Sequence, residues 1–297
     1  MDFYGVNDMH SDIQDMQALL ADNGYLADEN LVMALYLAQK LQKPLLLEGP
    51  AGVGKTELAK AWSRLGNRCL IRLQCYEGLD ESKALYEWNY QKQLLYIQVE
   101  AMTTKGWKAG KQQIFSSEFL LKRPLLEALT SEQPVVLLID EIDKSDPEFE
   151  SFLLEALSDW QVTIPELGTI KAIERPQVVL TSNSTRELSD ALRRRCLHYY
   201  IDYPDFQREI AIIELHVPGI ERQFLDTMVS FVQTLRKQPL KKPPSVTESV
   251  DWVQAMCILG EEQLTTENIR GTLTTLLKYT KDCNYILNKL PHLVPKG

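Results

Sequence analysis

One glycine-rich stretch constrains the fold of this 297-residue chain more than any other feature. It reads Gly49, Pro50, Ala51, Gly52, Val53, Gly54, Lys55 and Thr56. The order of Gly, four residues, Gly, Lys and Thr matches the P-loop pattern, and the stretch lies between an apolar run and a segment with helical periodicity. A glycine-rich turn before an ordinary helix is the alternative, and it would not require this spacing. The stretch therefore predicts a strand, a phosphate-binding loop and a helix.

The P-loop pattern also assigns roles to single residues. Its glycines allow successive backbone N–H groups to point at a phosphate, and the helix that opens at Glu57 adds the positive end of its dipole. Lys55 is expected to reach the β and γ phosphates, and the Thr56 hydroxyl is expected to bind Mg²⁺. We therefore predict that Gly49 to Thr56, together with Glu57, bind a nucleotide such as ATP.

A second stretch carries two acids at the end of a buried strand. Residues 135–139, VVLLI, are apolar without interruption, as in a strand buried on both faces of a parallel sheet, and Asp140 and Glu141 follow at its carboxyl end. Asp140 suits a carboxylate that acts on Mg²⁺, and Glu141 suits a base that orients the attacking water. The alternative is a group of strand-end acids that form turn hydrogen bonds. The P-loop upstream favours the catalytic interpretation.

Polar residues follow two further strand or helix segments. Asn183 ends the apolar run 178–183, where its amide could contact a phosphate oxygen or the attacking water, although an Asn after a strand is more often a turn residue. Arg193, Arg194 and Arg195 end a short helix before another strand. Each could simply complement the helix C-terminus. Three together also suit a guanidinium directed at the γ-phosphate of a neighbouring subunit.

Size and charge limit the remaining possibilities. The net charge of −9 argues against nonspecific binding of nucleic acid or of an anionic membrane. No apolar run approaches the roughly 18 residues that a membrane-spanning helix needs, and the acidic N-terminus is unlike a signal peptide, so a cytoplasmic location is expected. The five cysteines and four histidines are scattered, and we assign no disulfide or metal site to them.

The order of elements predicts two domains, residues 1–204 and 205–297. Within the first we expect a polar lead-in over 1–28, one aromatic helix over 83–104 and a hairpin over 160–173. The rings of the 83–104 helix could serve either packing or a partner contact. The second domain lacks strand patterns, and its helices are expected near 205–216, 219–236, 246–259 and 266–289.

The P-loop, LLIDEID, VVLTSN and ALRRRC, in this order and spacing, resemble an AAA+ ATPase. The hairpin and the insertion after Gln74 are similar to the MoxR branch. The stretches RLQCYEGLDESKALYEWNYQKQLL, FLLEALSDWQVTIPELGTI and TSNSTRELSDALRRRC are similar to the CoxD-like group, accessory ATPases of carbon monoxide dehydrogenase and related molybdenum hydroxylases. The resemblance implies an α/β fold with a parallel five-stranded sheet between helices, a hairpin insertion and a small helical lid.

The resemblance further implies roles, partners and cofactors. Lys55 and Thr56 would be the Walker A ligands, Asp140 and Glu141 the Walker B pair, Asn183 sensor 1, and Arg194 or preferably Arg195 the arginine finger. Gln74 could hold Glu141 in a resting pose. ATP and Mg²⁺, a hexameric ring, a von Willebrand factor A domain partner and a metalloenzyme client of the molybdenum hydroxylase type are implied.

One departure from the MoxR pattern concerns the lid. The start of the lid helix carries Ser245-Val246-Thr247-Glu248 in place of an arginine, so no sensor 2 residue is assigned, although Arg270 is one substitute. Two other functions remain open: an AAA+ ATPase that acts on nucleic acid, and a nucleotide-dependent scaffold that barely hydrolyses ATP. The intact Asp140–Glu141 pair argues against the scaffold.

Overall fold

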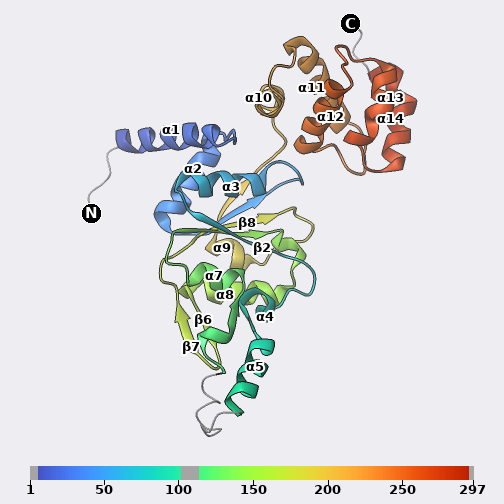
Figure 1. Ribbon diagram of the computed structural model, residues 1–297. Coiled ribbons are helices and arrows are strands. Elements are labelled where there is room, and N and C mark those ends of the chain that lie inside the picture. The colour runs from blue at the N-terminus through green and yellow to red at the C-terminus, as the bar shows by residue number, and fades with distance from the viewer. Residues whose placement is uncertain (1–5, 102–113, 294–297) are drawn as a thin grey trace. The chain divides into compact units, whose positions relative to one another are not determined.

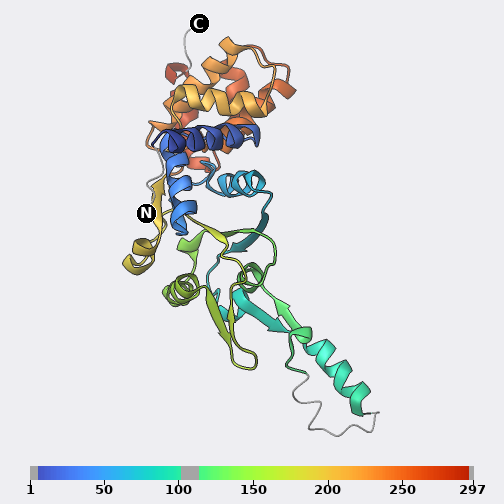
Figure 2. The ribbon, with the colours of Figure 1, turned by 90° about the vertical axis from the view of Figure 1, so that its left-hand side faces the viewer.

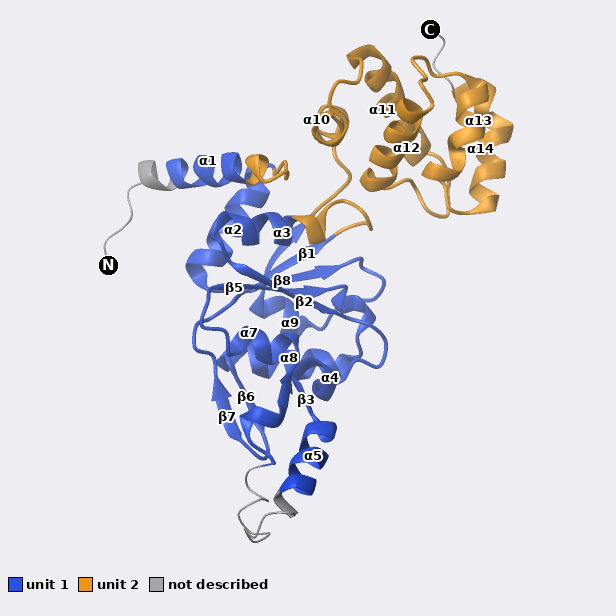
Figure 3. Ribbon diagram, in the orientation of Figure 1, with its two compact units in different colours: residues 1–19, 28–48, 58–200 blue, residues 20–27, 49–57, 201–297 orange. Residues whose placement is uncertain are grey.

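The computed structural model describes residues 6–101 and 114–293. The chain divides into two compact units (Figure 3). Unit 1 comprises residues 1–19, 28–48 and 58–200, and unit 2 comprises residues 20–27, 49–57 and 201–297. The domain boundary at residue 204 stays a prediction.

Unit 1 is built on a five-stranded parallel sheet of order β2-β5-β8-β1-β9 (Figure 1). The strands are β1 (Leu45–Glu48), β2 (Cys69–Gln74), β5 (Val135–Asp140), β8 (Gln177–Ser182) and β9 (Leu197–Tyr200). The predicted parallel sheet is therefore confirmed. Since the strands are parallel, the carboxyl ends of β5 and β8 meet at one edge, where ligands bind in open α/β sheets.

Helices cover both faces of this sheet (Figure 1). They are α2 (Glu29–Leu41), α3 (Lys55–Leu65), α7 (Pro124–Leu129), α8 (Pro147–Asp159) and α9 (Asp190–Arg195). On one face Leu46, Leu137 and Leu180 join a core with Leu126 and Leu153 of α7 and α8. The alternate strand residues, among them Leu45, Leu138 and Val179, are buried as well. Burial on both faces explains why the strands read as continuous apolar runs.

The segment predicted as one helix over 83–104 is broken, which corrects that expectation. Its described part forms α4 (Glu81–Leu85), β3 (Tyr86–Trp88) and α5 (Tyr90–Ala101), and residues 102–104 lie outside the described ones. A 3₁₀ turn over Ser117–Phe119 leads into β4 (Leu120–Lys122), which pairs antiparallel with β3. Trp88 packs edge-on against Phe115, so most of the aromatic stripe belongs to the core, and Tyr90 is its exposed member.

The predicted hairpin is present as β6 (Gln161–Ile164) and β7 (Gly168–Lys171). Figures 1 and 2 show the hairpin and α5 projecting from the same end of unit 1. The polar lead-in is wrong as a description of residues 6–22, because they form α1 (Val6–Asp22). Ile13 and Leu20 of this helix are buried, and burial of apolar side chains is what usually stabilises a helix in a protein.

The helical part of unit 2 consists of α10 (Phe206–His216), α11 (Arg222–Arg236), α12 (Val246–Ile258), α13 (Thr266–Leu276) and α14 (Thr280–Leu293). The last two replace the single helix predicted over 266–289. Leu277 caps α13 in an extended conformation and is buried, so the chain turns there without Gly or Pro. Among the described residues, none of the helices combines the length and the apolar character needed to cross a membrane.

Candidate functional site

The predicted P-loop begins at Gly49, the residue after β1, and continues into α3. Gly49 and Gly52 have φ angles of 149° and 76°, which glycine adopts without strain. A Cβ at Gly49 would lie 2.0 Å from the Ile201 carbonyl oxygen, and a Cβ at Gly52 would lie 2.5 Å from Ser245 Cβ. The loop therefore requires glycine at both positions.

The backbone of the loop fixes the position of Lys55. Its Nζ lies 2.7 Å from the carbonyl oxygen of Gly49 and 2.7 Å from that of Pro50, and the residue is buried. Thr56 and Glu57 follow in the first turn of α3. An ammonium group held at a loop and at a helix N-terminus favours an anionic ligand.

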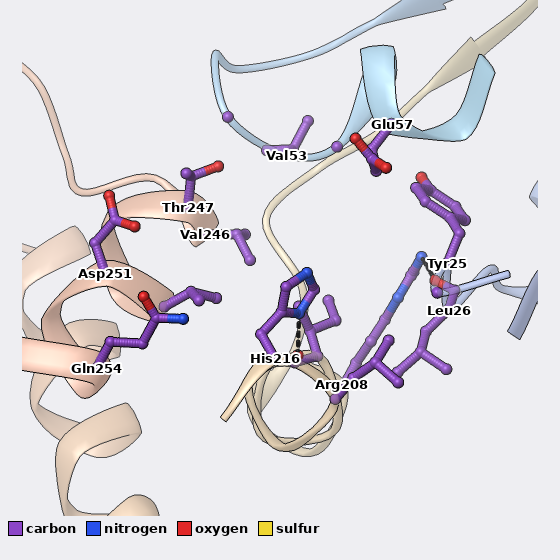
Figure 4. Close-up of a pocket in the computed structure, with 16 residues that line it drawn as sticks. Tyr25, Leu26, Val53, Glu57, Arg208, His216, Val246, Thr247, Asp251 and Gln254 are labelled. Carbon is purple, nitrogen blue, oxygen red and sulfur yellow. Dashed lines mark hydrogen bonds between the residues drawn. The ribbon is translucent and has the colours of Figure 1, made fainter. Parts of the chain in front are cut away.

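A cavity of about 360 Å³ in unit 2 borders the P-loop (Figure 4). P-loop residues, including Val53, and Glu57 of α3 contribute to its wall, as do Tyr25 and Leu26. Polar side chains of α12 enter at helical spacing, and α10 and α12 add apolar side chains as well as His216 at the end of α10. The α12 residues are Val246, Thr247, Val250, Asp251 and Gln254. This size and mixture are typical of a small-molecule pocket.

Arg208 of α10 brings a cation to this cavity that the sequence did not suggest. Its Nη2 donates a hydrogen bond to the Leu26 carbonyl oxygen at 3.0 Å. Arg270, named from the sequence as a substitute lid cation, is exposed on α13 and does not line the cavity. Thr247 in the first turn of α12 does line it.

At the carboxyl edge of the sheet in unit 1, Thr181 positions both predicted acids. Its hydroxyl donates to Asp140 Oδ1 at 2.5 Å and accepts a hydrogen bond from the Glu141 backbone N–H at 2.8 Å. Glu141 has a φ of 57°, a left-handed conformation that is uncommon for a residue other than glycine. The hydrogen bond from the Glu141 N–H to Thr181 of β8 stabilises this left-handed turn. The turn points the carboxylates of Asp140 and Glu141 in different directions.

Three side chains donate hydrogen bonds to the Glu141 carboxylate. Asn183 Nδ2 lies 3.1 Å from Oε1, while Gln74 Nε2 and Lys144 Nζ lie 2.8 Å and 2.7 Å from Oε2. The hydrogen bond to Glu141 raises the pKa of the Lys144 ammonium group. The ends of β2, β5 and β8 therefore bring Gln74, Glu141 and Asn183 together, and the contact of Gln74 with Glu141 is the one that the resemblance implies.

Asp143, to which we assigned no role from the sequence, anchors the Asn183 segment. Its carboxylate accepts hydrogen bonds from the backbone N–H groups of Asn183 and Thr185, at 3.2 Å and 3.0 Å, and from the Thr185 hydroxyl at 2.6 Å. Burial alone would raise the pKa of Asp143, but these hydrogen bonds outweigh it and the pKa lies below its usual value. Asp143 is therefore held ionised and fixes the backbone that carries Asn183.

Arg72 is another residue that sequence reasoning missed. Its guanidinium lies beside Asp140, with Nε 2.9 Å and Nη2 2.5 Å from Oδ2. The available signal was its position two residues before Gln74, which places both side chains on one face of β2. Thr181 has the same relation to Asn183.

The three consecutive arginines have different surroundings. Arg193 forms a two-point ion pair with Glu48 at the end of β1. Arg194 and Arg195 are exposed, and among the described residues no acid pairs with either. Both line a cavity of about 340 Å³ in unit 1, together with Lys43 and Arg175. The cavity lies beside residues that precede β1 and β9, at the amino ends of these strands.

Comparison with protein families identifies the class of this fold. The model of the AAA domain (dynein-related subfamily) matches residues 44–196, which is more than half of the chain. The chain belongs to the AAA domain family. The match contains the P-loop, both acids, Asn183 and the three arginines.

Several proteins resemble this AAA domain protein over most of its length. An uncharacterized protein of Staphylococcus epidermidis is 25% identical over 229 residues, which cover 75% of this chain and 78% of that protein. One from Staphylococcus haemolyticus is 25% identical over 247 residues, covering 80% and 85%. Among solved structures, the Thermotoga maritima RuvB Holliday junction branch migration motor matches 84% of this chain and 67% of its own, with a TM-score of 0.47 and 17% identity.

The residues of this AAA domain fit a Mg²⁺-bound nucleotide. The loop has glycines where a Cβ would clash, so its backbone is free to approach a phosphate closely. Lys55 provides a positive charge held by the loop itself. Thr56 of unit 2 offers a hydroxyl and Asp140 of unit 1 offers a carboxylate, and each is an oxygen ligand of the kind that Mg²⁺ prefers.

Proposed function

We propose that this AAA domain protein hydrolyses ATP and acts as a ring-forming chaperone that remodels a client protein. The observation that carries the proposal is the placement of the Glu141 carboxylate, which follows a buried strand and accepts hydrogen bonds from Gln74, at the end of β2, and from Asn183, directly after β8. A carboxylate restrained at this edge, in a chain with a P-loop, suits a base that orients water.

The chain's own residues would divide the work. The P-loop N–H groups and Lys55 would bind the phosphates, and Thr56 and Asp140 would hold Mg²⁺, which would supply positive charge to offset that of the phosphates. Glu141 accepts a hydrogen bond from the attacking water and takes its proton. Asn183, which contacts Glu141, lies within the same polar cluster and orients the water or a phosphate oxygen.

The arginines support a site completed by a second copy of the chain. Arg194 and Arg195 lie at the amino ends of the strands, whereas Glu141 follows the carboxyl end of one. They are exposed, and Lys43 and Arg175 add positive charge to the cavity that they line. We propose that Arg195, with Arg194 beside it, acts on the nucleotide of the next subunit in a hexamer.

The proposed client follows from the resemblance to the MoxR and CoxD-like proteins. The partner would carry a von Willebrand factor A domain, and the client would be a metalloenzyme of the molybdenum hydroxylase type that awaits its metal centre. One feature supports a client surface: α5 exposes four apolar side chains, at the same end of unit 1 as the hairpin. These are Tyr90, Leu94, Leu95 and Val99. Exposed apolar patches often mark protein contacts.

The proposal is tested by ATP hydrolysis and by client capture. Lys55→Ala should abolish nucleotide binding or hydrolysis. Glu141→Gln should bind ATP but lower the rate by about 10² to 10⁴-fold, the usual contribution of a general base. Full turnover by Glu141→Gln would remove Glu141 from its role.

The Glu141→Gln protein is also the reagent for capture. Purified in ATP with the products of neighbouring genes, it should retain a partner that the Lys55→Ala protein does not retain. Stimulation of hydrolysis by DNA or RNA would instead favour a nucleic-acid motor. ATP binding by the unaltered chain without turnover would favour a scaffold.

A further inference from the structure

Arg72 and Gln74 lie two residues apart on β2, so their side chains leave the same face of the sheet. β2 pairs in parallel with β5, and Gln74 is opposite Asp140 in this register. From here the Arg72 guanidinium reaches Asp140 Oδ2, with Nε at 2.9 Å and Nη2 at 2.5 Å. A side chain of the neighbouring strand thus contacts one oxygen of the acid that the proposed function assigns to Mg²⁺.

The two members of this ion pair differ in burial. The side chain of Asp140 is 3% exposed, whereas that of Arg72 is 51% exposed. A buried carboxylate is stabilised by a nearby cation and destabilised when the cation is removed. A half-exposed guanidinium, in contrast, can return to water at little cost. Arg72 is therefore the member of the ion pair that can leave and be replaced by another cation at Asp140.

Arg72 also determines how Gln74 is turned. Its Nη2 donates a hydrogen bond to Gln74 Oε1. Because an amide has one accepting end and one donating end, this bond turns Nε2 toward Glu141 Oε2, which lies 2.8 Å away. A continuous chain of hydrogen bonds therefore leads from Asp140 through Arg72 and Gln74 to the Glu141 carboxylate.

Other groups in the cluster do not form this link between the two carboxylates. Thr181 contacts the Asp140 carboxylate but only the backbone N–H of Glu141. Lys144 and Asn183 donate to the Glu141 carboxylate, from the residues that follow β5 and β8. Arg72 is the cation that contacts both Asp140 and the amide that restrains Glu141.

We propose that Arg72 is a positioning residue that couples metal binding at Asp140 to the release of Glu141, an inference that rests on the proposed function. While Arg72 holds Asp140 Oδ2, it keeps Gln74 bound to Glu141. Arg72 and Mg²⁺ compete for Asp140, so Arg72 moves into solvent when a Mg²⁺-nucleotide binds. Gln74 then loses its anchor, and the position that its amide held on Glu141 Oε2 becomes available to water, while Lys144 and Asn183 keep their bonds to the carboxylate.

The first test compares the thermal stability of two states of the full-length protein. Arg72→Gln should lower the melting temperature of the nucleotide-free protein, because Asp140 loses its ion pair with Arg72. With saturating Mg²⁺ and ADP the difference from the unaltered protein should disappear, because Arg72 has already left Asp140. An equal loss in both states would show a purely structural role and would overturn the inference.

The second test measures Mg²⁺ itself. The Mg²⁺ concentration at half-maximal binding of a fluorescent ADP analogue should fall by about two- to tenfold in Arg72→Gln, in line with the loss of a partly exposed ion pair. Arg123→Gln is the matched control, since Arg123 is 48% exposed and pairs with Glu87 in the β3–β4 sheet. The control should leave the midpoint unchanged, and an unchanged midpoint in Arg72→Gln would contradict competition.

Arg72→Lys separates the competition with Mg²⁺ at Asp140 from the restraint of Gln74. It also replaces Arg72→Gln as the test variant if Arg72→Gln does not fold. A lysine is a point charge that can still pair with Asp140 but lacks the planar fork that also reaches Gln74. It should preserve the Mg²⁺ midpoint and lose the coupling, so a Gln74→Ala change added to it should no longer alter single-turnover hydrolysis. One outcome is that the unaltered protein binds Mg²⁺-ADP while the Arg72 variants show the same melting temperatures and the same Mg²⁺ midpoint as the unaltered protein. In that case only this inference fails. If the unaltered protein binds no nucleotide, the proposed function fails.

Discussion

Arg193 donates to both carboxylate oxygens of Glu48, with Nη1 2.9 Å from Oε2 and Nη2 2.9 Å from Oε1. Glu48 is the last residue of β1 and its side chain is 5% exposed, against 38% for Arg193. His198 Nε2 lies 2.6 Å from the same carboxylate. The first of the three arginines therefore binds within its own unit, which leaves Arg194 and Arg195 as the candidates for an outward role.

Arg193→Ala should destabilise the fold. The change leaves the buried Glu48 carboxylate without its two-point partner, which should reduce the free energy of unfolding by about 1–3 kcal/mol. Urea denaturation measures this loss. Arg194→Ala, an exposed neighbour on the same helix, is the control and should stay within about 0.5 kcal/mol of the unaltered protein. Equal stability of the two variants would contradict a structural role for Arg193.

Arg195→Ala should leave nucleotide affinity unchanged and reduce hydrolysis by the assembled ring by about 10³ to 10⁵-fold, the contribution expected of an arginine finger. The isolated subunit, in which the finger has no target, should hydrolyse ATP at the same slow rate with or without the change. Steady-state assays over a range of protein concentrations distinguish the two cases.

Mixing two inactive variants provides a sharper test of action between subunits. An Arg195→Ala subunit retains Glu141, and a Glu141→Gln subunit retains Arg195, so adjacent subunits of the two kinds complete one site between them. Mixed rings should therefore recover part of the hydrolysis that each variant lacks alone. Mixed assemblies that stay inactive would argue that Arg195 acts within its own chain.

The elements that the sequence predicts well are those with a local pattern. The P-loop spacing, the apolar runs of β5 and β8 and the polar residues after them depend on neighbouring residues, so they could be read directly. The contact of Gln74 with Glu141 was implied by the resemblance to AAA+ ATPases, whereas Asn183 was expected to contact a phosphate oxygen or the attacking water.

The remaining contacts depend on long-range pairing. Glu48 and Arg193 are 145 residues apart, and Arg72 and Asp140 are 68 apart, so no periodicity connects them. The helix expected over 83–104 failed for the same reason, since β3 is stabilised by pairing with β4. Leu277 ends α13 because it packs in a core assembled from distant helices, which composition does not reveal.

Thr185→Val should weaken the protein at neutral pH more than at acid pH. Hydrogen bonds keep the pKa of Asp143 in the folded protein below its usual 3.8, so the stability they provide is complete above that value and is lost as the pH falls through the folded pKa. Removing the Thr185 hydroxyl should reduce the free energy of unfolding at pH 7 by about 1–3 kcal/mol. Urea denaturation between pH 7 and pH 3 should show the difference shrinking below pH 3.8, and Thr185→Ser should behave like the unaltered protein. A difference that is independent of pH would mean that the hydroxyl does not act through the Asp143 charge.

Two cysteines should make the fold sensitive to alkali. Burial, followed by the charges of Asp140, Asp143 and Glu141, raises the pKa of the Cys75 thiol to about 12, and burial raises that of Cys196 to about 12.

Because these folded pKa values lie above the usual 9.0, the stabilising effect is complete below pH 9 and is lost as the pH rises toward 12. In that pH range the thiol ionises in the unfolded chain but stays protonated in the folded one. For each of the two cysteines, this difference should lower the free energy of unfolding by at most about 1.4 kcal/mol per pH unit. Cys75→Ala should flatten this alkaline decline in urea denaturation, whereas Cys257→Ala, at an exposed position, should not. In the folded protein at pH 8, a maleimide should label Cys69 and Cys257 and spare Cys75 and Cys196 until urea unfolds the chain. Rapid labelling of Cys75 in the folded state would show that its thiol is accessible and that burial does not set its pKa.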